Sequence, residues 1–280
     1  MLELEHGFRI VDVHTQLPPT AGVTDDGFTP DRLEREMHQA GITKAVVVPP
    51  TQSETSYVAS NNGVARHSVD RPFVAFARIN GSQRPDETPT DRLHNTISRR
   101  LSPSAGRTDH HSTPEDIERY AYDDRFHGFV LDPSVDGYPD EEILAVLDDV
   151  GLPVLVHGGS DTPPTALAGT LLDRSFPVIV AHFGGHPLNR SSMNEMIDLL
   201  DEYDDCYVET SFVRYRRELE RALLEHPDRV LFGSATPASH PNVAVMEMLT
   251  LDVSEDRLWR VFSRNACRVV DALGPEYSRH

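Results

Sequence analysis

The stretch PVLVHGGSDTPPTALAGTLLDRSFPVIVAHFGG (residues 153–185) indicates the fold most directly, because two short apolar runs flank a helical segment in it. The runs at 153–157 and 178–182 have the length of buried strands, and 163–173 between them is predicted to be a helix. A strand, a helix and a second strand in succession are typical of a parallel sheet. Each run ends on a histidine, His157 or His182, close to a Gly-Gly pair.

The same alternation continues in both directions from this stretch. Strand-like runs lie at 8–14, 45–48, 73–79, 126–131, 153–157, 178–182, 207–210 and 230–233. Helical segments lie near 30–40, 54–69, 115–122, 140–150, 163–173, 190–202, 214–225 and 241–249, and a final one covers 257–273. Strands that alternate with helices in this number favour a closed barrel over an open sheet. We therefore predict one α/β domain over residues 1–280, folded as a (β/α)₈ TIM barrel.

Residues 80–113 interrupt this rhythm after the third predicted strand. The segment is polar and rich in Gly, Pro, Ser and Asp, and within it Leu93, Ile97 and Leu101 recur every four residues, which predicts a short helix with one apolar face. A segment that follows a barrel strand projects from the end where barrels carry their active sites. Two interpretations stay open: a lid over the site, or a surface insertion without a role.

The chain is strongly acidic, because 45 acidic against 26 basic residues give a formal net charge of −19, and Lys44 is the only lysine. The acidic residues are spread along the chain, which favours a solvated surface of the halophilic kind over that of an ordinary acidic cytoplasmic protein. Such a charge repels nucleic acid and anionic membranes. No apolar run approaches the roughly 20 residues of a membrane span, and the start lacks the pattern of a signal peptide. We expect a soluble cytoplasmic protein without nucleic-acid or membrane partners.

Three predicted strands end on a histidine: His14 in VDVHTQ (11–16), His157 and His182. Side chains at the carboxyl ends of barrel strands point into the mouth of the barrel, so the three imidazoles are predicted to converge. Residues two apart on a strand share a face, so Gln16 should point the same way as His14, with Asp12 one layer deeper. Imidazole is a standard ligand of zinc and similar ions. The sequence therefore predicts a polar site that can hold a metal ion.

The chain resembles the amidohydrolase-related family, which includes metal-dependent hydrolases and decarboxylases of the aminocarboxymuconate-semialdehyde and resorcylate types. The resembling segments follow the family's order over nearly the whole chain: VDVHTQ (11–16), GFVLDP (128–133), PVLVHGG (153–159), IVAHFGG (179–185), YVETS (207–211), RVLFGSATP (229–237) and RNACRVV (264–270). The resemblance implies the barrel fold, His14 and His157 as metal ligands, and His182 as the catalytic histidine.

The chain departs from the family pattern at two metal-binding positions. Gln16 replaces the second histidine of the family's His-x-His, and Ala235 replaces the aspartate of its FGSDxP, which in the family binds the metal and shuttles a proton. Gln16 keeps an amide oxygen, which is a weak neutral ligand. Asp132 is a further candidate ligand, since it follows the fourth strand, but Asp132-Pro133 is also a common way to open a loop.

Two more residues are candidates for substrate contact: Glu209, a carboxylate on the seventh strand, and His186, at the rim beyond the sixth. His110 and His111 fall in the polar segment and are expected to be solvated. The chain has no serine-nucleophile elbow, phosphate loop or dinucleotide-binding glycine motif that would indicate another chemistry.

These observations predict a metal-dependent hydrolase or decarboxylase that acts on a small carboxylate, amide, ester or lactone. One divalent ion, zinc or similar, would be held by His14 and His157 with help from Gln16 or Asp132. His182 would act as general base or as an electrostatic partner of the developing oxyanion. A barrel that has lost catalysis and serves as a binding or regulatory protein is one alternative. A metal-free lyase or isomerase using His182 and His157 as acid and base is another. The resemblance also implies a homodimer.

Overall fold

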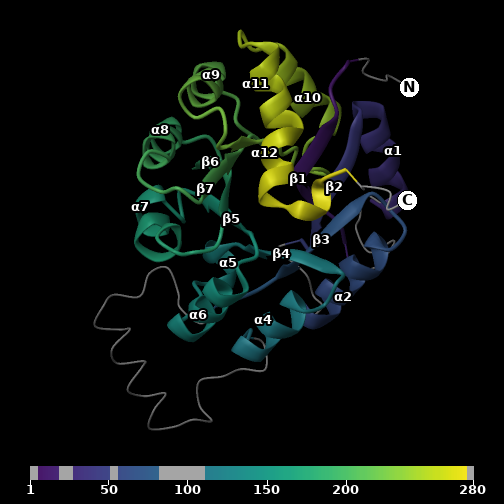
Figure 1. Cartoon of the computed structure of the whole chain (residues 1–280), viewed down its shortest axis with the longest axis vertical. Helices are drawn as coiled ribbons and strands as arrows, with labels where there is room; N and C mark the ends of the chain where they lie inside the picture. Colours follow the sequence, from purple (N-terminus) through teal and green to yellow (C-terminus); the bar gives the residue numbers. More distant parts are fainter. Residues whose placement is uncertain (1–5, 19–27, 51–55, 82–110, 276–280) are drawn as a thin grey trace.

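The computed structural model describes residues 6–18, 28–50, 56–81 and 111–275. Most of the predicted insertion at 80–113, including its predicted short helix and His110, lies outside these residues. The described segments form eight parallel strands arranged in the order of the sequence (Figure 1). The strands are β1 Ile10–Gln16, β2 Ile42–Val48, β3 Phe73–Arg78, β4 Phe126–Leu131, β5 Val154–Gly159, β6 Val178–His186, β7 Cys206–Glu209 and β8 Val230–Leu231.

The barrel closes where the chain beyond β8 meets β1. The backbone N–H of Val13 donates to the carbonyl of Phe232 at 2.9 Å, and that of Gln16 donates to Thr236 at 2.7 Å. Every neighbouring pair from β1 to β8 is parallel. The prediction of a single (β/α)₈ barrel is therefore confirmed.

Helices surround the ring of strands, as Figure 1 shows. They are α1 Pro30–Ala40, α2 Tyr57–Ser68, α4 Pro114–Ala121, α5 Pro133–Asp136, α6 Glu141–Val150, α7 Pro164–Leu167, α8 Arg190–Leu199, α9 Arg216–Glu225, α10 Pro241–Leu249, α11 Glu255–Trp259 and α12 Asn265–Val269. The final predicted helix is broken up, since a π-helical turn at Arg260–Arg264 joins α11 to α12 and a 3₁₀ turn at Asp271–Leu273 follows.

Local sequence signals explain where these helices begin and end. Thr113 caps α4 and forms a reciprocal capping box with Asp116, which satisfies two backbone donors of the first turn. Gly41 and Gly151 end α1 and α6 in the left-handed conformation, with φ of 72° and 64°. Glycine adopts this conformation without the steric cost that a Cβ atom brings.

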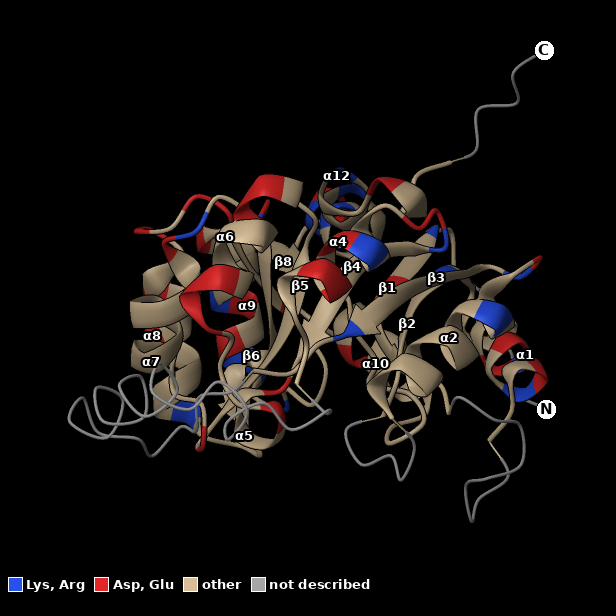
Figure 2. Cartoon of the chain, turned by 90° about the horizontal axis from the view of Figure 1, so that it is seen from below, with Lys and Arg blue, Asp and Glu red and all other residues tan. Residues whose placement is uncertain are grey.

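The core has two layers, one between the strands and the outer helices and one inside the barrel. Inside, apolar side chains such as Val13, Phe76, Leu155 and Ile179 fill the ring, as packed barrels require. Ala266, Val270 and Leu273 belong to the same cluster, so α12 and the 3₁₀ turn close one end of the barrel. Figure 2 shows α12 and α5 on opposite sides of the molecule. Because α5 directly follows β4, the carboxyl ends of the strands lie at the end of the barrel that α12 does not close.

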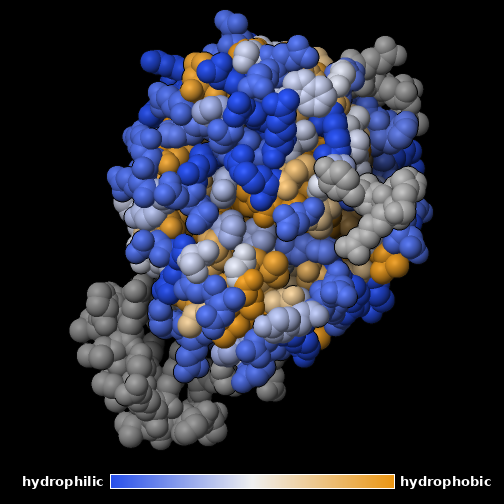
Figure 3. Space-filling view, viewed as in Figure 1, coloured by the Kyte–Doolittle hydropathy of each residue, from blue (hydrophilic) through white to orange (hydrophobic). Residues whose placement is uncertain are grey.

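The surface is polar. Hydrophilic residues cover most of the face seen in Figure 3, and acidic residues occur on many of the outer helices (Figure 2). None of the helices in the described ranges is long and apolar enough to cross a membrane.

Candidate functional site

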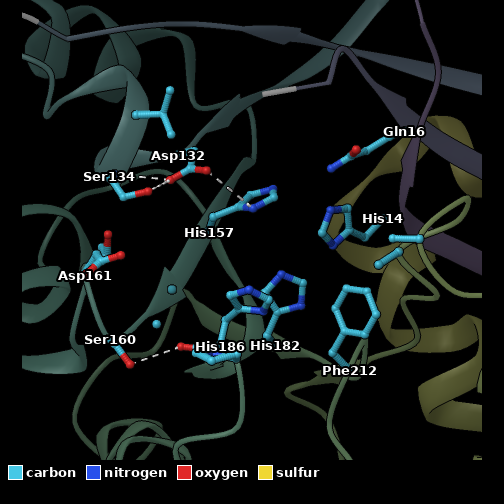
Figure 4. Close-up of a pocket in the computed structure, with 17 residues that line it drawn as sticks. His14, Gln16, Asp132, Ser134, His157, Ser160, Asp161, His182, His186 and Phe212 are labelled. Carbon is cyan, nitrogen blue, oxygen red and sulfur yellow. Dashed lines mark hydrogen bonds and ion pairs between the residues drawn. The ribbon is translucent and has the colours of Figure 1, made fainter. Parts of the chain in front are cut away.

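A cavity of about 410 Å³ opens at the carboxyl ends of the strands (Figure 4). Six of the candidate ligand, catalytic and substrate-contact residues line it: His14, Gln16, Asp132, His157, His182 and His186. Strands β1, β5 and β6 carry five of the six to the same end of the barrel, and Asp132 directly follows β4, since parallel strands end together. The topology thus brings together side chains that are more than 170 residues apart in the chain.

The three strand-end histidines are in mutual contact. The ring centroids of His14 and His157 are 4.9 Å apart, those of His14 and His182 are 5.3 Å apart, and those of His157 and His182 are 5.5 Å apart. Their convergence follows the sequence prediction. On β1, however, the pairing with β2 shifts register between Asp12 and Thr15, and Val11 and Val13 fill the barrel interior. His14, within this irregularity, and Gln16, beyond it, line the cavity, whereas Asp12 does not.

Glu209 is fully buried behind the histidines and accepts four hydrogen bonds. Its Oε1 accepts from Nδ1 of His14 at 3.1 Å, from the backbone N–H of His182 at 2.8 Å and from Oγ of Ser211 at 2.6 Å. Its Oε2 accepts from the backbone N–H of Ser211 at 2.7 Å. Glu209 is not among the described residues that line the cavity, so the substrate contact expected from the sequence is not part of this arrangement. It anchors the two histidines instead.

The surroundings keep Glu209 ionised and two of the histidines neutral. Burial alone would raise the pKa of Glu209, but the hydrogen bonds from His14 and Ser211, together with the electrostatic effect of the neighbouring His14 and His182 rings, outweigh burial and lower that pKa to about 2. Burial lowers the pKa of His182 to about 4, despite the nearby carboxylate. Burial, reinforced by the neighbouring His14, also lowers the pKa of His157 well below its usual value. Neutral imidazoles carry the lone pair that a metal or a proton needs.

The hydrogen-bond partner of His14 determines which of its nitrogens is available. An ionised carboxylate can only accept, so Nδ1 of His14 carries the proton that bonds to Glu209. In the neutral ring Nε2 then has the lone pair, and it is a buried polar atom without a hydrogen-bond partner in the described structure. A buried acceptor of this kind is costly unless a ligand satisfies it.

The charges of the cavity also fit a cation. Asp132 and Asp161 are on its wall, and none of the described lining residues is lysine or arginine. The residues present therefore suit a divalent metal ion. His14, His182 and Glu209 offer ligand atoms within 4.8 Å of one another, but the oxygens of Glu209 already hold four donors. The nitrogens that face the cavity are the better ligands.

Asp132 opens a loop, which is one of the two roles considered for it, and one of its oxygens also lies near His157. Its Oδ1 caps the short helix α5 by accepting from the backbone N–H and the hydroxyl of Ser134, at 3.2 and 2.6 Å. Its Oδ2 lies 3.9 Å from Nδ1 of His157. The residue opens a loop, and one of its oxygens still faces the cavity, as Figure 4 shows.

Ala235 also lines the cavity, at the position where the resemblance places an aspartate. Its backbone has a positive φ of 56°, and its N–H donates to the carbonyl of His14 at 2.9 Å. The turn that would present a carboxylate is thus in place, and the methyl group supplies neither a ligand nor a proton acceptor.

Besides Ser134 and Asp161 on the cavity wall, three residues around the histidines were not singled out from the sequence. Ser211 bonds to both Glu209 and His182, Phe212 stacks near His182 with centroids 5.4 Å apart, and Gly233 leaves room for the carboxylate of Glu209. Ser211 and Gly233 lie in the segments YVETS and RVLFGSATP, which carry the family resemblance. Their place in these segments was the only sequence signal for them.

Solved structures with the same fold are known. The chain is similar to a 2,6-dihydroxybenzoate decarboxylase from Rhizobium, with 15% identity and a TM-score of 0.61 over 95% of this chain and 100% of that one. An uncharacterised TIM-barrel protein from Bordetella bronchiseptica has 19% identity and a TM-score of 0.64, covering 96% and 100% of the two chains.

A 5-carboxyvanillate decarboxylase from Novosphingobium aromaticivorans, complexed with manganese and 4-hydroxy-3-methoxy-5-nitrobenzoic acid, has 15% identity and a TM-score of 0.59 over 94% and 96%. At these identities the likeness establishes the fold. No curated protein matches the sequence. The sequence profile of the amidohydrolase family matches residues 11–272, which is nearly the whole chain, and the chain therefore belongs to the amidohydrolase family.

Proposed function

We propose that the protein is a metal-dependent hydrolase or decarboxylase that acts on a small molecule in the cavity at the carboxyl ends of the strands. The observation that carries the proposal is the buried, unpartnered Nε2 of His14, which is held toward a cavity shared with His157 and His182. His14 and His157 would hold one divalent ion, zinc or manganese, with Gln16 or Asp132 completing the set. Such an ion supplies Lewis-acid polarisation of a carbonyl or carboxylate oxygen.

His182 is the group that moves the proton in this proposal. It is neutral near pH 7 and lines the cavity, so it can accept a proton from a bound molecule and later return it. Ala235 cannot share this work, because it has no titratable group. The chain's own chemistry therefore depends on a single imidazole where the family pattern has an aspartate as well.

The cavity limits the substrate to one small molecule. The ring of Phe212 lies against His182 and His186, with centroids 5.4 and 6.0 Å apart, which provides a flat wall for a planar substrate. Two structural neighbours act on hydroxylated aromatic acids, and an aromatic carboxylic acid or its ester or lactone is the class that we assign here. The ion would offset the negative charge of Asp132 and Asp161 when a carboxylate enters.

The site argues against a purely binding or regulatory barrel. A buried carboxylate is costly unless it is fully hydrogen-bonded, and Glu209 has four donors that orient two imidazoles. A binding surface gains nothing from such an arrangement.

Metal titration tests the proposal. Protein stripped with a chelator should take up about one Zn²⁺ or Mn²⁺ per chain, measured by elemental analysis after desalting in molar KCl. His157→Ala should lose this uptake, whereas His38→Ala, which changes an exposed histidine on α1, should keep it. A wild-type protein that stays metal-free at millimolar Zn²⁺ and Mn²⁺ would overturn the metal-dependent function.

We also propose that the protein works in a salt-rich cytoplasm, as a homodimer. The excess of 45 acidic over 26 basic residues supports the first point, and only the family resemblance supports the second. Thermal unfolding between 0.1 and 3 M KCl and light scattering at 1 M KCl test them. A melting temperature that falls with added salt would contradict the salt-rich cytoplasm, and a monomeric mass would contradict the homodimer.

A further inference from the structure

Ser211 lies at the junction between the two histidines and the buried carboxylate. It follows β7 by two residues and is 1% exposed. Its Oγ is 2.6 Å from Oε1 of Glu209, 2.7 Å from Nδ1 of His182 and 3.4 Å from Nδ1 of His14. One hydroxyl proton must therefore serve several close contacts, and counting protons shows where it goes.

Glu209 accepts and does not donate in this arrangement. Two of its four partners are the backbone N–H groups of His182 and Ser211, which can only donate, and one of these faces each oxygen. The hydroxyl of Ser211 must place its single proton on Oε1 of Glu209. Otherwise, two oxygens would face each other at 2.6 Å with no proton between them.

His182 must then donate to Ser211. With its proton on Glu209, Oγ of Ser211 has only lone pairs left for Nδ1 of His182. The backbone carbonyl of Ser211, 3.1 Å from the same nitrogen, can also only accept. Both contacts require a proton on Nδ1, so Nε2 of His182 is the unprotonated nitrogen, and the described structure shows no hydrogen bond to it.

The backbone of His182 is held by the same carboxylate. Its φ of 59° and that of Phe183, 51°, are rare for residues other than glycine. The hydrogen bond from the N–H of His182 to Glu209 fixes this bend, and the bond to Ser211 fixes the ring. Backbone held in such a conformation by its surroundings is a feature of functional sites.

We propose that Ser211 is a positioning residue for His182. Because its hydroxyl proton is donated to Glu209, its oxygen accepts a hydrogen bond from His182 and holds the His182 ring as the Nδ1–H tautomer, with Nε2 open to the cavity. The proposal rests on the proposed role of His182 as proton acceptor. Together with the direct bond from His14, it makes one carboxylate orient two imidazoles from different strands.

The test reads the tautomer directly and needs no substrate. Two-bond ¹H–¹⁵N correlation spectra of ¹⁵N-histidine-labelled, chelator-stripped protein distinguish the Nδ1–H from the Nε2–H form, and a His182→Gln spectrum assigns the signals. Wild-type His182 should be entirely Nδ1–H. In Ser211→Ala it should become a mixture of both tautomers or a broadened signal, and Ser211→Thr, which restores the hydroxyl, should return it to Nδ1–H.

A matched control removes a buried hydroxyl elsewhere. Ser263 is 6% exposed and its Oγ bonds only to the carbonyl of Trp259 among the described groups, so Ser263→Ala should leave the His182 signals unchanged. An Nε2–H tautomer in the wild type would overturn the proposal even if the alanine variant failed to fold. A pure Nδ1–H tautomer in folded Ser211→Ala would also overturn it, because the backbone carbonyl would then suffice.

The tautomer of His182 and the metal-dependent function can be tested independently. Zn²⁺ uptake by Ser211→Ala should stay at about one ion per chain, since His14 bonds to Glu209 directly. Loss of metal binding in the wild type would contradict the metal-dependent function and leave the tautomer result standing.

Discussion

Replacing Gly233 by alanine should break the anchor of the site. A Cβ atom at this position would lie 1.9 Å from Oε2 of Glu209, 2.8 Å from its Cδ and 3.3 Å from Cβ of His14. The glycine cannot easily move away, because the hydroxyl of Thr210 bonds to both its N–H and its carbonyl, at 3.2 and 3.3 Å. The carboxylate of Glu209 must therefore yield.

The size of the effect follows from the distances. An ordinary contact requires Oε2 to retreat by about 1 Å or more, which stretches its 2.7 Å bond from Ser211 to roughly 3.7 Å, beyond hydrogen-bonding range. Each hydrogen bond to a charged group contributes about 1.5–3 kcal/mol, and overpacking adds its own strain. Loss of one or two such bonds should destabilise Gly233→Ala by about 3–5 kcal/mol.

Urea unfolding of metal-stripped protein, followed by circular dichroism, measures this loss. Gly169→Ala is the control, because a Cβ atom there meets nothing within 4 Å, so its stability should be unchanged or slightly higher. Zn²⁺ uptake by folded Gly233→Ala should also weaken, since His14 loses its fixed partner. A cost below about 1 kcal/mol with normal metal uptake would show that Glu209 is free to shift, and the anchor would be refuted.

Three further changes test other parts of the site. Ala235→Asp adds a carboxylate in a left-handed turn that aspartate tolerates, so affinity for Zn²⁺ should rise at least about tenfold in chelator-competition titrations. Ala235→Asn should keep the wild-type affinity. Equal affinities of Ala235→Asp and the wild type would show that a side chain at position 235 does not reach the ion. Asp136→Ala leaves the buried Arg78 without the two hydrogen bonds that it donates to this carboxylate, at 3.1 and 2.8 Å. The free energy of unfolding in urea should therefore fall by about 3–5 kcal/mol, and a fall of less than about 1 kcal/mol would contradict this. Burial raises the pKa of Asp12 from 3.8 to about 7, so protonation stabilises the fold as pH falls between these values. Asp12→Asn should therefore exceed wild-type stability at pH 8 by up to about 4 kcal/mol and match it near pH 4, and a pH-independent difference would contradict this.

The barrel was predictable because its signals are local and repeated. Each apolar run at 126–131, 153–157 or 178–182 is short, bounded by turn residues and followed by an amphipathic segment, and parallel strands in this rhythm have few ways to pack. The convergence of His14, His157 and His182 followed from the same topology, since barrel strands end at one face.

The irregular parts of the site were not predictable. Alternation along a regular strand would place Asp12, His14 and Gln16 on one face, but β1 shifts register against β2. Asp12 accepts from the backbone N–H groups of His14 and Ser234 and does not line the cavity. The ring of His14 depends on Glu209, 195 residues away. Long-range pairs of this kind leave no periodic trace in one sequence.

The two departures from the family pattern, Gln16 and Ala235, should not affect metal binding equally. Gln16 lines the cavity with an amide, whereas Ala235 leaves the barrel's eighth strand without a carboxylate. A carboxylate is nevertheless present across the cavity, because Oδ2 of Asp132 stands beside His157 while Oδ1 is used for capping. An ion that moved toward β4 would keep two imidazoles and one carboxylate, a set common to open metal sites. Asp132→Asn should then weaken metal binding more than Gln16→Ala, and the reverse order would place the ion nearer β1.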